Sequence, residues 1–95
     1  MFSFPGIKIV SFIPGRVRLR VDKVKDDDQL ARRVEKELSG LACIKLVETK
    51  VDSGSVLIKY DRKLLKQAQN AEALLSTLKS LFPDFDTEKI RPYLT

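Results

Sequence analysis

Apolar and basic residues alternate along residues 16–21, which are Arg-Val-Arg-Leu-Arg-Val. Successive side chains of a β-strand point to opposite faces of a sheet, so this period of two predicts a strand with one apolar and one basic face. The side expected to face the core consists of Val17, Leu19 and Val21. The residues expected together on the other side are Arg16, Arg18 and Arg20.

Two longer stretches have the periodicity of a helix. Asp26, Asp27 and Asp28 begin the first, where one carboxylate can cap the helix and the others suit its positive end. Ser39 and Gly40 end it. Its buried stripe recurs every three or four residues and consists of Leu30, Ala31, Val34, Leu38 and Leu41. A similar stripe predicts a second, continuous helix from about Arg62 to Phe82, which Pro83 ends.

Shorter apolar runs predict the remaining strands. Residues 44–49 and 56–60 flank the turn sequence Asp52-Ser53-Gly54 and are expected to form a hairpin. Residues 7–12 can extend a strand before the turn at Pro14-Gly15. Residues 87–94 form either a short fourth strand or a terminal helical turn, and Pro92 restricts any strand there to an edge or an end.

The order strand, helix, strand, strand, helix, strand predicts an α+β fold of the ferredoxin-like split βαββαβ kind. This is a four-stranded antiparallel sheet with both helices on one face. We assign residues 1–13 to an N-terminal extension and 14–95 to the domain. Strands 16–21 and 56–60 are expected side by side in the centre, so that their outward residues share the open face. These five residues, here called the basic face, are the candidate binding residues Arg16, Arg18, Arg20, Leu57 and Lys59.

The net charge of +5 is concentrated in one part of the chain, because residues 1–25 hold six basic side chains and one acidic one. A concentrated basic patch favours an acidic partner. The other interpretation is that an exposed strand face carries basic residues only to remain soluble and to discourage edge pairing. The apolar content of 43% and charged content of 33% are ordinary for a folded globular domain. No apolar run is long enough to span a membrane, and we expect a cytoplasmic domain.

The chain lacks the residues that most catalytic mechanisms require. The chain has no histidine, which excludes Ser-His and Cys-His nucleophilic systems, and its four glycines match no phosphate-binding loop. We therefore expect no enzyme activity, no catalytic residues and no cofactor. The run Asp26 to Asp28 is interpreted as helix capping rather than as a site for a hard cation, whose ligands are usually spaced along a curved loop.

A family resemblance rests on residues 38–61. Leu38-Ser39-Gly40 is followed by Ile-Lys-Leu-Val at 44–47 and by Asp-Ser-Gly-Ser-Val-Leu-Ile-Lys-Tyr-Asp at 52–61. This resembles the heavy-metal-associated (HMA) domain, in which a strand pair with a Thr-Gly or Ser-Gly turn ends in Tyr-Asp before the second helix. Residues 14–21 are similar to a divergent second type, found as free small proteins and at the N-termini of some P-type metal-transporting ATPases.

The resemblance also implies where a metal would be held. Metal-carrying members place Cys-x-x-Cys in the loop between the first strand and the first helix, where two thiolates grip a soft ion. The corresponding loop here, residues 22–28, contains no sulfur, and the single cysteine, Cys43, lies at the far end of the helix. We therefore expect an HMA-like domain that has lost the metal motif, with no metal ligands and with Cys43 buried.

These expectations favour a protein-interaction or regulatory module. The resemblance links it to metal transport or metal homeostasis, with an acidic surface on a P-type metal ATPase, on a related assembly or on a second copy of the chain as partner. The alternative is weak, salt-sensitive binding of a nucleic-acid backbone, since the basic face has no aromatic side chain on which bases could stack. Attachment to anionic lipid is a weaker hypothesis, because neither helix has a basic face with bulky apolar anchors.

Overall fold

A computed structural model describes residues 3–4 and 6–88 of the 95-residue chain. The N-terminal half contains β1 (Ser3–Phe4), β2 (Ile7–Ile13), β3 (Arg16–Val21) and α1 (Asp28–Ser39). The C-terminal half contains β4 (Ile44–Lys50), β5 (Ser55–Tyr60), α2 (Arg62–Leu65) and α3 (Ala68–Leu81).

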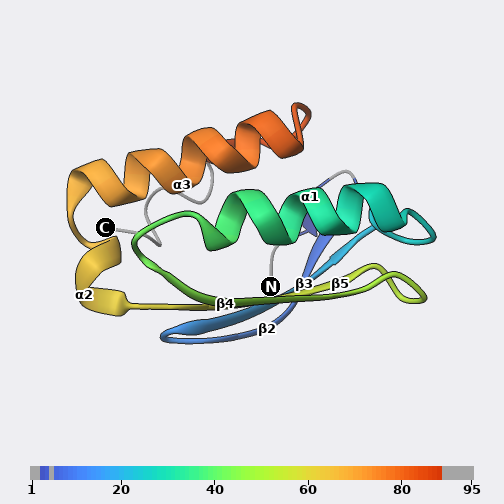
Figure 1. Ribbon diagram of the computed structural model, residues 1–95, viewed down its shortest axis with the longest axis horizontal. Coiled ribbons are helices and arrows are strands. Elements are labelled where there is room, and N and C mark those ends of the chain that lie inside the picture. Colours follow the sequence, from blue (N-terminus) through green and yellow to red (C-terminus); the bar gives the residue numbers. More distant parts are fainter. Residues whose placement is uncertain (1–2, 5, 89–95) are drawn as a thin grey trace.

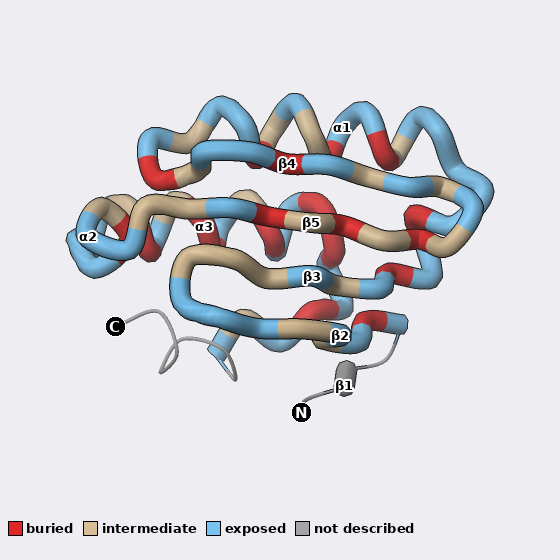
Figure 2. The backbone as a smooth tube through the Cα atoms, turned by 90° about the horizontal axis from the view of Figure 1, so that it is seen from below, coloured by how far each residue is buried: buried red, intermediate tan, exposed pale blue. Residues whose placement is uncertain are grey.

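The strands form one antiparallel sheet in the order β1-β2-β3-β5-β4. Figure 1 shows α1 and α3 covering one face of this sheet, while Figure 2 looks onto the other face, which no helix of the described residues covers. The α+β, ferredoxin-like arrangement predicted from the sequence is confirmed. β3 and β5 are neighbours in the middle of the sheet, as the order of elements predicts.

The strand beside β3 comes from the N-terminus. β2 pairs antiparallel with β3 from Ile7–Val21 to Ile13–Arg16, and the two strands are joined by a tight turn in which Gly15 has a φ of +90°. Glycine adopts this left-handed conformation without the clash that a Cβ would cause. The sequence predicts a short strand or a terminal helical turn over residues 87–94. Residues 87 and 88 are helical, and the rest of that segment lies outside the described residues.

The helical region that follows β5 is divided. The predicted continuous helix is wrong, because α2 ends at Leu65 and Gln67 has the extended angles φ −69° and ψ 127° before α3 begins. The Asn70 side chain stabilises the break by donating from Nδ2 to the Leu64 carbonyl oxygen at 2.8 Å. Polar side chains that bond to nearby backbone in this way compete with the helical hydrogen bonds.

The core lies between the sheet and the two long helices. Val21, Val56 and Ile58 of the central strands are buried, and Val17 and Leu19 pack against them. From α1, the buried side chains are Ala31, Val34 and Leu38. The predicted alternation of β3 and the predicted stripe of α1 are therefore both confirmed.

Candidate functional site

The five residues of the basic face lie together on the open side of the sheet. In the register of β3 against β5, Arg16 is opposite Lys59 and Arg18 is opposite Leu57. Arg18, Arg20 and Lys59 are exposed, whereas Arg16 and Leu57 are half-buried. The alternation along residues 16–21 and 56–60 thus predicted which side of the sheet each of these side chains occupies.

The same surface extends over two further strands that the sequence reasoning left out. Directly opposed residues of antiparallel strands share a face, so the registers of β2 and β4 identify the additional members. From β2 they are Lys8, Ser11 and Ile13, and from β4 they are Leu46, Glu48 and Lys50. The alternation along Leu46, Glu48 and Lys50 could have indicated the β4 members. In β2, the register shift between Ile9 and Ser11 interrupts the alternation and conceals the pattern.

The charges on this surface are arranged unfavourably for stability. Lys8 lies directly opposite Arg20, and Arg16 lies directly opposite Lys59. Like charges in these positions destabilise a sheet. Within the described residues, the ion pairs are Lys23–Asp84 and Arg33–Glu37, and neither involves a residue of the open sheet face. An acidic molecule bound across these strands would relieve the repulsion.

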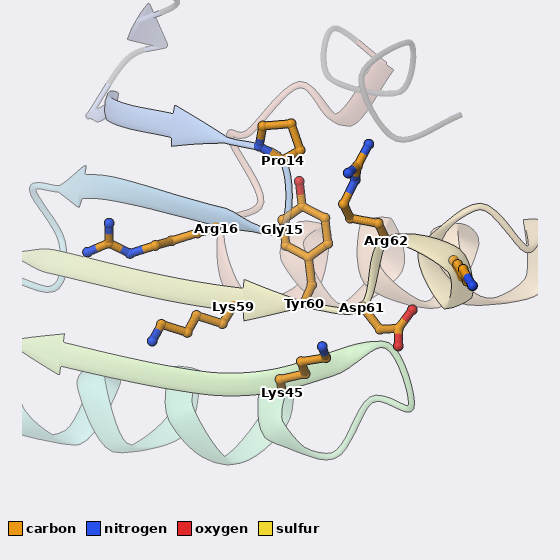
Figure 3. A pocket seen from close by; sticks show the side chains of 9 residues that line it. Pro14, Gly15, Arg16, Lys45, Lys59, Tyr60, Asp61 and Arg62 are labelled. Carbon is orange, nitrogen blue, oxygen red and sulfur yellow. The ribbon is translucent and has the colours of Figure 1, made fainter.

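A depression of about 540 Å³ lies at the end of the open face where the β2–β3 turn meets β5 and α2 (Figure 3). It is formed by the turn residues Pro14 and Gly15, by Tyr60 and Asp61, and by five basic side chains. The basic residues are Arg16, Lys45, Lys59, Arg62 and Lys63. Arg16 and Lys59 therefore belong both to the basic face and to this basic depression, whereas Lys45, Arg62 and Lys63 belong to the depression alone.

The single carboxylate in the depression has a structural role. Asp61 caps α2, accepting a hydrogen bond from the backbone amide of Leu64 at 3.0 Å. That hydrogen bond is the main reason why the pKa of Asp61 lies below its ordinary value, with smaller contributions from Lys45 and Lys63. Asp61 therefore remains ionised at neutral pH and offsets only part of the positive charge around it.

The loop between β3 and α1 is closed by backbone hydrogen bonds. The amide of Val21 donates to Gly54 at 2.8 Å, and the amide of Asp26 donates to Val51 at 2.8 Å. Val24 is fully buried in the middle of the loop. Asp27 caps α1 by accepting from the amide of Leu30 at 2.9 Å, which confirms the capping interpretation for this residue. Among residues 3–4 and 6–88, no cluster of three or more His, Cys, Asp or Glu side chains is placed to hold a metal ion.

Cys43 lies at the start of the strand pair and is only 1% exposed, as predicted. Burial raises the pKa of the Cys43 thiol above its ordinary value of 9.0. The protonated, inaccessible thiol is a poor nucleophile and a poor metal ligand.

We therefore expect Cys43 to resist alkylation in the folded protein. Iodoacetamide at neutral pH should label it at the rate of global unfolding and label it fully in concentrated urea. Mass spectrometry along a urea series measures the modified fraction. Rapid labelling without urea, at the rate of an unstructured cysteine peptide, would contradict the buried position.

These features define a ferredoxin-like domain with an open basic sheet face and a sulfur-free loop between β3 and α1. The chain matches the family described as heavy metal associated domain 2 over residues 1–81, and it belongs to that family. The match includes β2 as well as the elements that follow it. No curated protein and no solved structure matches the chain. None of the helices within the described residues is long and apolar enough to cross a membrane.

Proposed function

We propose that this domain is a non-catalytic protein-interaction or regulatory module that docks an acidic partner on its basic face. The observation that supports it most directly is the pairing of Lys8 with Arg20 and of Arg16 with Lys59 on adjacent strands. Such a surface is destabilising in the free domain and becomes favourable when carboxylates lie against it. Arginine side chains suit this role because each guanidinium can bond a carboxylate with two parallel hydrogen bonds.

The apolar residues of the face support a protein partner. Leu57 is half-buried between Arg18 on β3 and Glu48 on β4, and Leu46 nearby is 36% exposed. Together they offer a small apolar contact within a charged surround, which is the usual composition of a protein interface. Family membership suggests that the partner takes part in metal transport or metal homeostasis, for example an acidic surface on a P-type metal ATPase or a related assembly.

A second copy of the chain fits this face less well. A two-fold symmetric contact would bring the same basic residues of both copies together, and the resulting repulsion opposes association. An acidic partner of different sequence is therefore the occupant that we propose.

Titration with a fluorescent oligoglutamate peptide tests the proposal, with oligoglutamine as the uncharged comparison. Replacing Arg16, Arg18 and Arg20 with serine should weaken peptide binding about 30-fold, because three surface charge pairs at about 0.7 kcal/mol each contribute roughly 2 kcal/mol. The matched control replaces Arg32, Arg33 and Lys36 with serine, which removes the same charge from the exposed side of α1. Equal weakening by the two variants would show a general charge effect and contradict a docking face.

The alternative, binding of a nucleic-acid backbone, is decided by the same titration with single-stranded RNA and DNA at two salt concentrations. The residues that we assign to the open face from β2, β3, β5 and β4 include no aromatic side chain for base stacking. We therefore expect only weak binding that higher salt removes. Nucleic-acid binding tighter than peptide binding, at the same ionic strength, would replace the proposed function.

A further inference from the structure

The β2–β3 hairpin ends in a run of exposed apolar side chains. Phe12 is 45% exposed and Ile13 is 53% exposed, and Pro14, which follows them, is exposed as well. Phe12 is opposite Val17 and Ile13 is opposite Arg16, so the two side chains lie on different faces of the sheet. The tip of the hairpin is therefore apolar on both sides.

Such a tip is unusual for a domain that acts only in water. A run of three exposed apolar residues is unfavourable in water unless the residues form a contact with another molecule. Of the four large apolar residues exposed within the described part of the chain, three lie on β2, namely Val10, Phe12 and Ile13. Neither the five residues of the basic face nor the packing of the core accounts for this concentration.

Positive charge lies on one side of the tip. The turn residues Pro14 and Gly15 form one wall of the basic depression, whose cations come from β3, β4, β5 and α2. In Figure 3, Pro14, Tyr60 and Arg62 gather near the turn, while Arg16 and Lys59 point in the same direction over the sheet. The exposed basic side chains of the depression are Lys45, Lys59, Arg62 and Lys63. None of them forms an ion pair within the described residues. Lys45 and Lys63 act on Asp61 only at longer range, by lowering the pKa of its carboxyl group.

We propose that this end of the molecule attaches to the surface of an anionic lipid bilayer. The apolar tip enters the boundary between headgroups and acyl chains, and the surrounding cations contact lipid phosphates. A bilayer presents these two chemistries in the required order, with apolar material directly below a negatively charged layer. A small phosphate compound would use the cations and leave Phe12 and Ile13 in water.

One polar backbone group of the turn already has a partner within the protein. Polar backbone groups that leave water need partners. The Gly15 carbonyl accepts a hydrogen bond from the Tyr60 amide at 3.0 Å, which ties the turn to β5. The hairpin therefore presents Phe12, Ile13 and Pro14 on a fixed support. A weak apolar anchor combined with a basic patch is sufficient for reversible attachment, whereas either alone is marginal.

Vesicle co-sedimentation of the full chain tests the proposal. One set of vesicles is pure phosphatidylcholine, and the other is an equimolar mixture of phosphatidylcholine and phosphatidylglycerol. We expect binding to the mixed vesicles and little to the neutral ones. The variant Phe12→Thr/Ile13→Thr should lose at least about tenfold in affinity. The variant Lys45→Ser/Arg62→Ser/Lys63→Ser should lose about 100-fold, since each cation near an anionic surface contributes about fivefold.

Two matched variants separate this site from general effects and from the docking face. Val10→Thr removes an exposed apolar side chain of the same strand away from the tip, and Arg18→Ser/Arg20→Ser removes two charges from the basic face. Both should retain vesicle binding more fully than the tip variant. Oligoglutamate binding should in turn be unchanged in Phe12→Thr, because Phe12 is opposite Val17 and lies on the other face of the sheet from the basic face, so the two proposals can fail separately.

The proposal is overturned if the wild-type chain does not bind the mixed vesicles or if the tip variant binds them as the wild type does. Calorimetric titration with inorganic pyrophosphate provides the remaining comparison. Pyrophosphate binding without vesicle binding would identify a site for small soluble oxyanions instead. Circular dichroism of each variant should match that of the wild type, because every substituted side chain is exposed.

Discussion

Replacing Gly54 with alanine is expected to lower the free energy of unfolding by about 3 kcal/mol or more. Gly54 has a φ of +73°, and a Cβ at this position would lie 2.5 Å from the carbonyl oxygen of Val21. That oxygen belongs to backbone at the end of β3, and the Gly54 carbonyl in turn accepts the Val21 amide at 2.8 Å. Neither the backbone at Gly54 nor the backbone at Val21 can move away without breaking this hydrogen bond, which joins the β4–β5 turn to β3.

Gly6 provides the matched control for this prediction. Its φ of +76° is nearly the same, but the nearest atom to an added Cβ is a carboxylate oxygen of Asp22 at 4.0 Å. Gly6→Ala should therefore cost only the left-handed backbone strain, about 1–2 kcal/mol. Urea unfolding of the two variants measures both losses. Equal losses would show that the close approach to Val21 is relaxed in the variant and that the turn is not held as the structure indicates.

The sequence was sufficient for those features that depend on strict periodicity. The alternation of β3 predicted that Arg16, Arg18 and Arg20 lie on one face of the sheet and that Val21 is buried, because a strand has only two faces. The stripe of α1 and its cap at Asp27 followed from local rules of the same kind. Central placement of β3 and β5 followed from the order of elements, since few topologies accommodate it.

Features that depend on tertiary contacts were less accessible. Residues 7–13 are rich in apolar residues, yet only their pairing with β3 shows that this segment joins the sheet. The break before α3 depends on an Asn70 side chain that reaches back to Leu64, which no helical periodicity reveals. The basic depression combines residues from β3, β4, β5 and α2, and its existence follows from where the strands end.

Val24 is the residue through which the loop between β3 and α1 becomes part of the core. It is fully buried among the core residues although it lies outside every helix and strand. Val24→Ala is expected to lower the free energy of unfolding by about 2 kcal/mol, because it removes buried methyl groups and leaves a cavity. The exposed neighbours Lys23 and Lys25 provide controls, and replacing either with alanine should change stability by no more than about 0.5 kcal/mol.

The same loop is where metal-carrying members of the family are expected to hold their thiolates. Here Val24 is buried in the core, Asp27 caps α1, and the Asp26 amide donates a hydrogen bond to the Val51 carbonyl. The residues of this loop therefore stabilise the fold. Rearranging it around an ion would sacrifice these contacts. A ligand that binds the native state raises the unfolding midpoint by mass action. Cu(I) or Zn²⁺ should therefore leave the thermal midpoint of the wild-type chain unchanged, and a concentration-dependent rise would contradict this account of the loop.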